Sequence, residues 1–449
     1  MSTANHAAEQ SSEYHLVEAL ITSDRAVTGI DISRLVNAMK IFEHIEKPYL
    51  TMSISFADEE NIVQDFDFQG GEKLTIRLIE TEETDSGNEI RKEFVIDKII
   101  KAEKIEERRE NIVLHCTEYH MFESIVQNVN KSFIGAPTTI IEKIINTHLS
   151  KKAMVDGIDS IQDMKVVIPN MHPIEAAMWL RKRSTTSSGF PFFVYSPLGI
   201  DNIVIRDLDK MLSQTVQNLQ NPYVYAPSAN IGSSNIKYYT IDDYKYESSE
   251  NLVRLIQSGN VGSKNVFYDT LNGISESIHF NVDDLFKEVV KKNLLGGDNS
   301  RYAFSNEFKV KDKRIAEYDS RVISSISSTG AYNNLNTVFK SYNDETIKGN
   351  QNKKIKQAAL KNFLTKSPLS ITVKSREFLS GDANYTLGKA IRVAFLDTNS
   401  NTDINKPVFD LKKSGDYIIM GANHSFFGEK AVSTLLLGKI ASLGVETKL

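Results

Sequence analysis

The residues best suited to metal chemistry are His115, Cys116 and His120, which lie close together in the sequence. Zinc requires three or four such ligands converging at about 2.0–2.3 Å. His115 and Cys116 are neighbours on a predicted strand, so their side chains point to opposite faces of it. We therefore expect a buried cysteine beside surface histidines and no metal site. His172 and His424 stand alone, and we expect each to be a packed or capping residue.

The sequence has no GxSxG nucleophile elbow, no Walker A loop, no HExxH helix and no GxGxxG fingerprint. The run Gly296-Gly297-Asp298-Asn299-Ser300 lacks the Lys-Ser/Thr pair that binds a phosphate, so it predicts a turn. The acidic pairs Glu82-Glu83 and Glu106-Glu107 lie in polar runs, whereas the acid of a glycosidase needs an apolar pocket that raises its pKa. Three lysine pairs are predicted to be solvated helix ends: Lys151-Lys152, Lys291-Lys292 and Lys353-Lys354. We predict no catalytic residue, no cofactor-binding residue and no metal ligand.

The composition is that of an ordinary globular protein, with 41% hydrophobic and 25% charged residues. A chain of 449 residues is too long for one compact core, so we expect about two to four domains. The net charge of −5 argues against an exposed nucleic-acid-binding surface. The single cysteine, Cys116, is typical of a reducing compartment. Residues 1–13 are polar and predict a disordered tail, and no apolar run is long enough to span a bilayer.

The N-terminal part of the chain predicts antiparallel strands. In Glu72 to Glu80, three aliphatic residues alternate with polar ones, which indicates a strand with one buried face. Tyr49 to Phe56, Phe94 to Ile100 and Asn111 to Cys116 are also predicted strands, and the charge run from Lys101 to Glu110 predicts a solvated hairpin between the last two. Strands linked by hairpins favour a barrel or a sandwich.

The middle of the chain predicts two helices and a strand pair. The first helix carries a stripe of isoleucines, and Thr139 with Glu142 fits a capping box at its start. The second begins at Pro173, a residue tolerated in a first helical turn. Phe190 to Tyr195 and Asn202 to Arg206 predict two strands, so the region is interpreted as a small α/β domain.

The C-terminal part returns to strands. Helices are predicted at Val282 to Leu295 and Lys348 to Phe363. The predicted strands that follow are Leu369 to Lys374, Ala390 to Leu396, Gly415 to Met420 and Ala431 to Ile440. Ile76-Arg77 and Ile391-Arg392 each follow a glycine within an alternating strand, a similarity too short to prove a repeat.

The predicted fold class is α+β, with two tail-tube-like β-barrel domains, a small α/β domain and a mixed insertion. The predicted limits are 1–13 for the tail, 14–118 for the first barrel, 119–222 for the α/β domain, 223–250 with 347–449 for the second barrel, and 251–346 for the insertion.

Several strings occur in an order that resembles the baseplate central hub proteins of T-even-like contractile-tail phages. They are Asp31 to Val36, Tyr49 to Phe56, Gly70 to Leu74, Lys131 to Gly135, Ile168 to Pro173, Ala176 to Arg183, Phe192 to Tyr195, Lys412 to Ile419 and His424 to Phe426. The last two also resemble the end of the hub-like part of type VI secretion spike proteins. The resemblance extends from about residue 20 to 440 and is weakest in the insertion.

The resemblance implies a structural, non-enzymatic subunit of the virion tail baseplate, assembled in the host cytoplasm. It implies a homotrimer whose six barrels form a pseudo-hexameric ring between the hexameric tail tube and the trimeric central spike, with the genome leaving through it. The implied partners are the spike protein and the tube or tube-initiator protein, with wedge and tape-measure proteins as further candidates. No sequence-specific nucleic-acid binding and no membrane insertion are expected. The alternatives are a spike component of a secretion or injection system, or a tail-associated peptidoglycan hydrolase.

Overall fold

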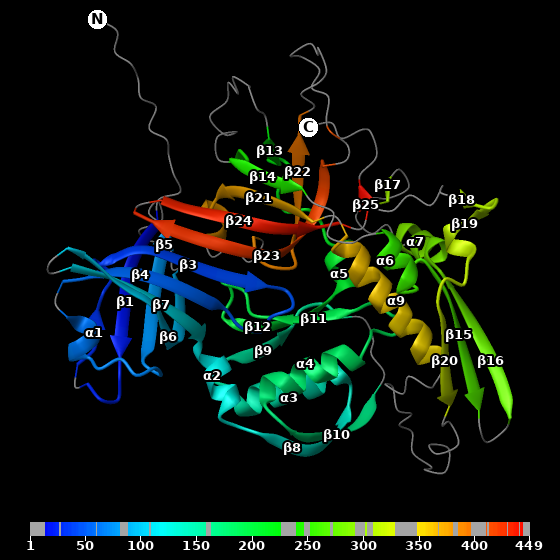
Figure 1. Cartoon of the computed structure of the whole chain (residues 1–449), viewed down its shortest axis with the longest axis horizontal. Coiled ribbons are helices and arrows are strands. Elements are labelled where there is room, and N and C mark those ends of the chain that lie inside the picture. The colour runs from blue at the N-terminus through cyan, green and yellow to red at the C-terminus, as the bar shows by residue number, and fades with distance from the viewer. Residues whose placement is uncertain are drawn as a thin grey trace, which may run out of the picture.

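The computed structural model describes residues 14–26, 28–59, 61–80, 89–106, 109–158, 163–225, 239–246, 252–269, 273–291, 301–302, 309–327, 348–366, 368–379, 385–396, 410, 413–428, 430–439 and 441–442. This part of the chain is a mixed α+β structure, made mostly of strands in several sheets (Figure 1). The predicted α+β class is confirmed. None of the helices described here is long and apolar enough to cross a membrane.

The first set of strands, which we call the N-terminal module, pairs in the order β3-β4-β7-β6-β5-β1-β2, and every pair is antiparallel. Its strands are β1 (Tyr14–Thr22), β2 (Ile30–Asp31), β3 (Val36–His44), β4 (Thr51–Asp58), β5 (Lys73–Glu80), β6 (Ile90–Glu106) and β7 (Arg109–Glu118). The short helix α1 (Ile62–Asp65) follows β4. Leu74, Ile76 and Leu78 of β5 are buried, as their alternation predicted.

A second set, the C-terminal module, repeats this pairing order as β14-β21-β24-β23-β22-β13. Its strands are β13 (Tyr223–Tyr225), β14 (Asp243–Tyr246), β21 (Leu369–Lys374), β22 (Ala390–Phe395), β23 (Gly415–Phe427) and β24 (Lys430–Gly438). The helix α10 (Arg376–Leu379) follows β21 as α1 follows β4. The two modules differ in that β13 pairs parallel to β22, whereas β1 pairs antiparallel to β5, and in that β2 has no counterpart among the described strands of the C-terminal module. Ile76-Arg77 and Ile391-Arg392 therefore lie on corresponding strands, β5 and β22.

The two modules share one sheet. Residues 421–427 of β23 pair antiparallel with residues 38–44 of β3, which joins both sets into a single 13-stranded sheet. Among the described strands the pairing is an open path from β14 to β2, and no strand pair closes it into a ring. The structure therefore corrects the expectation of two closed barrels. Alternation along a strand reveals which face is buried but carries no information about which distant strand lies beside it.

The region between the modules contains two small sheets and four helices. The strands are β8 (Val129–Gly135), β9 (Lys152–Val155), β10 (Met164–Met171), β11 (Phe192–Tyr195) and β12 (Asn202–Asp207). The helices are α2 (Tyr119–Ile125), α3 (Pro137–His148), α4 (Pro173–Arg183) and α5 (Leu208–Ser213). As predicted, α4 begins at Pro173. The capping box at Thr139 is wrong: α3 begins at Pro137 and its N-cap is Ala136, so Thr139 lies inside the first turn, where its side chain caps nothing.

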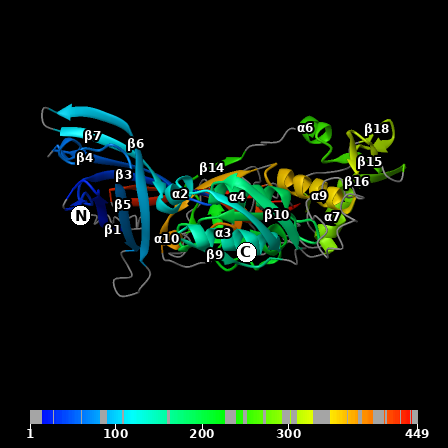
Figure 2. The same cartoon turned by 90° about the horizontal axis from the view of Figure 1, so that it is seen from below.

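An insertion between β14 and β21 forms a separate three-stranded sheet in the order β16-β15-β20. Its elements are α6 (Leu252–Gln257), β15 (Gly262–Asp269), β16 (Ile274–Asn281), α7 (Val282–Lys291) and β20 (Val322–Ser327), followed by α9 (Lys348–Leu364). The short pairs β17 (Arg301–Tyr302) with β25 (Ala441–Ser442), and β18 (Lys309–Val310) with β19 (Lys313–Arg314), complete the strands. Viewed from below, the insertion and the β6–β7 hairpin lie at opposite ends of the molecule (Figure 2).

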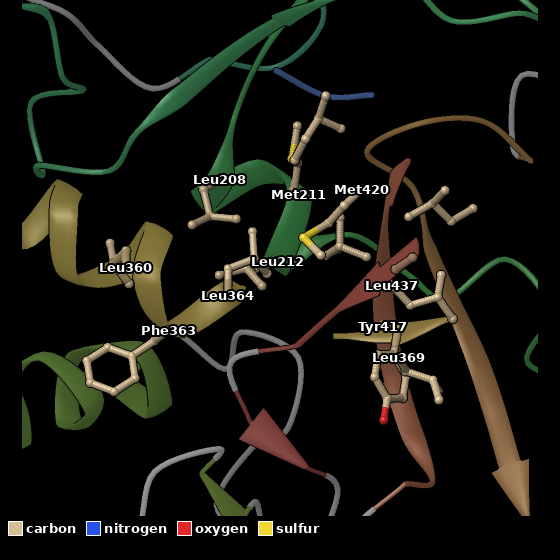
Figure 3. Close-up of a cluster of buried hydrophobic side chains, with 14 of the residues drawn as sticks. Leu208, Met211, Leu212, Leu360, Phe363, Leu364, Leu369, Tyr417, Met420 and Leu437 are labelled. Atoms are coloured by element: carbon tan, nitrogen blue, oxygen red, sulfur yellow. The ribbon is translucent and has the colours of Figure 1, made fainter. Parts of the chain in front are cut away.

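One apolar core joins the C-terminal module to the helices around it. Leu208 from α5, Phe363 from α9 and Leu437 from β24 belong to the same buried cluster (Figure 3). Phe286 of α7 packs edge-on against Phe363, with ring centroids 5.2 Å apart. This cluster contains side chains from the middle region, the insertion and the C-terminal module together. It therefore marks no boundary between them, and the domain limits given above remain a prediction.

A close contact at Gly388 fixes the middle region against the C-terminal module. Gly388 has a φ of +75°, and a Cβ added there would lie 2.6 Å from the Tyr195 hydroxyl. That hydroxyl donates a hydrogen bond to the Leu387 carbonyl at 3.2 Å. A side chain at Gly388 would therefore meet both backbone strain and a buried ring.

We predict that Gly388→Ala lowers the free energy of unfolding by about 1–3 kcal/mol, because it adds a methyl group to a filled space at a left-handed backbone position. Urea unfolding followed by circular dichroism measures the change. Gly199→Ala is the matched control: a Cβ there has no neighbour within 4 Å, so its effect should stay within about 0.5 kcal/mol. Equal effects of the two substitutions would contradict this view of the contact.

Candidate functional site

The structure separates the three residues that most resembled a metal site. Cys116 is fully buried in the core of the N-terminal module, and burial raises the pKa of its thiol well above the usual range. His115 lies on the opposite face of β7 and pairs with Asp97, with Nδ1 2.7 Å from Oδ1. His120 is buried and donates from Nε2 to the Pro48 carbonyl at 2.7 Å. In the residues that the structure describes, no cluster of three or more His, Cys, Asp or Glu side chains could hold a metal ion.

Glu118, at the end of β7, is the centre of a buried polar group. One carboxylate oxygen accepts hydrogen bonds from the Leu50 amide at 2.7 Å and from the Ser196 hydroxyl at 2.9 Å. The other accepts from the ammonium of Lys151, which also donates to Ser196 at 2.6 Å. Ser196 begins the turn after β11, and Lys151 directly precedes β9. Glu118 therefore ties the middle region to the N-terminal module.

Lys92 of β6 extends this group. Its ammonium donates to the Ile200 carbonyl at 2.8 Å and lies 3.6 Å from the Asp201 carboxylate. Beside it is a surface depression of about 310 Å³ whose lining includes Tyr119 and Ser150 as well as Lys92, Glu118 and Lys151. We call Lys92, Glu118, Lys151 and Ser196 the polar junction. All four are buried, so they connect parts of the chain and present little charge to solvent.

The charges of the polar junction depend on one another. Burial alone would raise the pKa of Glu118, but the nearby Lys151, His120 and Lys92 outweigh it and hold that pKa at about 2. Burial, together with the Lys151 charge, lowers the pKa of Lys92 to about 8, although Glu118 opposes the change. Removing Glu118 or Lys151 would leave an uncompensated charge in the interior.

A second buried group lies where the modules meet, and it has the residue types of a catalytic triad. Nε2 of His424 is 3.2 Å from the carboxylate of Glu43, and Nδ1 is 2.7 Å from the hydroxyl of Ser433. Ser433 in turn contacts the hydroxyl of Ser375 at 2.7 Å. In hydrolases the Nε2 atom of the histidine faces the serine and the Nδ1 atom faces the acid, the reverse of this arrangement.

Burial also argues against catalysis here. His424 and Ser433 are both fully buried, and Glu43 is 5% exposed, so a substrate has no route to the hydroxyl. The second oxygen of Glu43 accepts a hydrogen bond from the Leu198 amide at 2.6 Å. Glu43 on β3 thus binds β23 through His424 and the turn after β11 through Leu198. The group holds three parts of the chain together, and the expectation that His424 is a packed residue agrees with this placement.

One face of the shared sheet, opposite the buried core face, is built by both modules together. Two cross-strand rows run over β21, β24, β23, β3, β4 and β7. The first row is Thr372, Thr434, Asn423, Phe42, Thr51 and Thr117, and the second is Lys374, Val432, Ser425, Lys40, Ser53 and His115. We call these residues the sheet face. Hydroxyl and amide side chains dominate the two rows, whose lysines are Lys40 and Lys374. Beyond them, the first row continues to Asp243 of β14 and the second to Lys98 of β6.

Sequence reasoning missed both buried polar groups and the sheet face. Glu118 ends β7 and Glu43 lies within β3, each at a position that the alternation assigns to the buried face. A carboxylate at such a position was the sequence signal for a buried polar group. Their partners lie far away in sequence, and no local pattern points to them. The serines and threonines of the sheet face follow the alternation correctly, but only the β3–β23 pairing shows that they form one surface.

We predict that acid unfolds the protein partly through Glu118. Its folded-state pKa of about 2 lies below its ordinary value of 4.5, so the stability it contributes is present above pH 4.5 and is lost as the pH falls toward 2. Glu118→Gln should lower stability near neutral pH and flatten its dependence between pH 4.5 and 2, as urea titrations at several pH values would show. Glu175→Gln, on the exposed side of α4, is the control. An unchanged pH dependence in Glu118→Gln would contradict the assignment.

No protein-family model and no curated protein sequence matches the chain. Among solved structures, the 43 kDa tail protein of prophage MuSo2 from Shewanella oneidensis aligns over 94% of this chain and 97% of its own, with 10% sequence identity and a TM-score of 0.50. A tail protein from Neisseria meningitidis MC58 aligns over 95% and 97%, with 10% identity and a TM-score of 0.48.

The Escherichia coli c3393 protein is a type VI secretion system component described as similar to the T4 bacteriophage tail proteins gp27 and gp5. It aligns over 90% of this chain and 73% of its own, with 7% identity and a TM-score of 0.39. At these identities the likeness concerns the fold, and the Shewanella structure is the match that supports it. The chain has the fold of a prophage tail protein.

Proposed function

We propose that this protein is a structural hub subunit of a contractile phage tail, which assembles into a ring between the tail tube and the central spike. The observation that carries the proposal is the sheet face. A single surface spans two modules with the same strand order, as expected for a wall built from repeated units. The fold of the Shewanella tail protein supports the same assignment.

The chemistry of the sheet face fits the lining of a passage for DNA. Each lysine or arginine that pairs with a phosphate adds salt-dependent affinity by releasing counterions. In their row, Val432 and Ser425 separate Lys40 from Lys374, so DNA would meet few such contacts along the two rows. A mainly neutral wall lets a polyanion slide past without being held.

The geometry of the second buried group supports a non-enzymatic role. The one constellation of acid, histidine and serine that we describe, Glu43, His424 and Ser433, is closed to substrate and holds the modules together. Cell-wall cleavage would then reside on another tail component. Virion location and a trimeric state, in which two modules per chain reconcile a sixfold tube with a threefold spike, belong to the same proposal.

We predict that the purified protein forms a ring of three chains, alone or with its spike protein, because two modules per chain around a threefold axis place six similar modules in one ring. Light scattering gives the mass, and negative-stain electron microscopy shows whether the particle has a central opening. A trimer that forms only with the spike protein would agree with the proposal. A stable monomer under both conditions would defeat it.

We also predict that the assembled protein binds duplex DNA with a Kd no tighter than about 10⁻⁶ M at physiological salt. A gel-shift titration at several salt concentrations measures this. Ser53→Lys combined with Ser425→Lys should tighten binding and steepen its salt dependence, whereas Glu276→Lys, on the exposed insertion, should change neither. Tight binding by the unmodified protein, or indifference to the two added lysines, would count against a neutral lining.

A further inference from the structure

The repeated strand order allows each strand of one module to be matched with a strand of the other. In each module one pair of buried residues on neighbouring strands serves as the reference for the match. These pairs are Ile54 with Leu114, between β4 and β7, and Ile371 with Leu435, between β21 and β24. With these two pairs superposed, β3 corresponds to β14 and β6 corresponds to β23. A register shift supports the match, because β6 and β23 are interrupted at the same step, after Ile96 and after Ile419. Two further shifts in β6, after Ile99 and after Lys104, have no counterpart in β23.

The corresponding strands differ in what lies beside them. The first part of β23 pairs with β22, and its second part, residues 421–427, pairs with β3. The first part of β6 pairs with β5 in the same way, and contacts on that edge end at Ile96. From residue 98 to residue 106, the only described strand that pairs with β6 is β7. Likewise β3 pairs with two strands, β4 and β23, whereas the described strand that pairs with its counterpart β14 is β21. The residues just before β14 also touch β13, through a bridge between Val224 and Thr240.

We infer that residues 98–106 of β6 pair antiparallel with β14 of a second copy of this chain, and so repeat the β23–β3 junction between subunits. The inference rests on the proposed ring function and names its interface. Such a contact joins two different surfaces, so it is heterologous and generates a closed ring when the rotation between copies closes. It also places a strand against the edge of β6, where exposed Ile99 and Ile100 would otherwise remain in water.

The matched ladders give the register of this pairing. In the junction within the chain, Lys40 lies opposite Ser425. Lys245 faces Ser370, and Lys40 faces Ser53. The two serines are matched positions, so Lys245 occupies the position of Lys40. Glu103 occupies the position of Ser425, because their partners on the next strand, Asn111 and Val432, correspond. Lys245 of one copy is therefore placed opposite Glu103 of the next, and the opposite charges favour the contact.

Cysteine cross-linking tests the register directly. With Glu103→Cys and Lys245→Cys in one chain, mild oxidation should link neighbouring copies and yield a species of three chains on a denaturing gel, because directly opposed residues of antiparallel strands can meet disulfide geometry. Each single variant should remain one chain. The pair Glu103→Cys with Glu276→Cys is the matched control, since Glu276 lies on the insertion and outside the proposed interface. The buried native Cys116 is common to all variants.

Charge reversal gives a second readout that does not depend on disulfide geometry. Glu103→Lys and Lys245→Glu should each weaken association roughly tenfold or more, since each places like charges opposite one another. The double variant should recover association, as measured by sedimentation at a series of concentrations. Glu276→Lys should leave it unchanged.

The outcomes separate this inference from the proposed function. If the cysteine variant assembles to the same mass as the unmodified protein but does not cross-link, and the charge variants assemble normally, the β6–β14 pairing is wrong while the ring function stands. If every variant and the unmodified protein remain monomeric, with and without the spike protein, both fail. Cross-linking of the Glu103–Lys245 pair with recovery in the double charge variant supports both.

Discussion

The ladder between β3 and β23 determines how the rest of the molecule can be arranged. It joins strands that lie almost at opposite ends of the chain, and it turns two modest sheets into one surface. Glu43 makes the ladder specific, since its buried carboxylate must find partners and does so in His424 of β23 and the Leu198 amide. A register shift of one residue would turn the Glu43 side chain to the other face of the sheet. Its carboxylate would then lose both hydrogen-bond partners.

The polar junction performs a related task beneath the sheet. Glu118 and Lys92 come from the N-terminal module, whereas Lys151 and Ser196 come from the middle region, and every contact between them is buried. Apolar surfaces could hold these parts together with less directional preference. A buried ion pair with satisfied hydrogen bonds favours one arrangement and penalises others, because any displaced charge would be left without a partner. This rigidity suits the hub role proposed above.

The local features of the fold could be predicted from the sequence, and the long-range ones could not. The alternation in β5, the isoleucine stripe of α3 and the start of α4 at Pro173 follow from side-chain periodicity and backbone chemistry within a few residues. The capping box failed because Pro137 begins the helix two residues earlier than Thr139 would. Hairpin-linked strands led to the expectation of barrels. It was wrong because strand order depends on partners far away in sequence, as the β3–β23 ladder shows.

The site was predictable only in part for the same reason. His424 could be recognised as a packed residue, yet nothing near it in sequence indicates Glu43 as its partner. The Ile-Arg similarity between β5 and β22 was not a sign of the repeated strand order, because the matched ladders place Ile391 at the position of Leu74 and Ile76 at the position of Val393. The repeat becomes visible when each ladder is matched to its counterpart.

A cryo-electron microscopy reconstruction of the assembled protein tests the central claim most directly, namely that the shared sheet forms the wall of a ring. The account predicts that the opening is lined by the sheet face, with Ser53, Asn423 and Thr434 directed into it, and that the sheet continues from β6 of each copy into β14 of the next. An assembly in which those side chains are buried against another subunit, or point away from the opening, would contradict it.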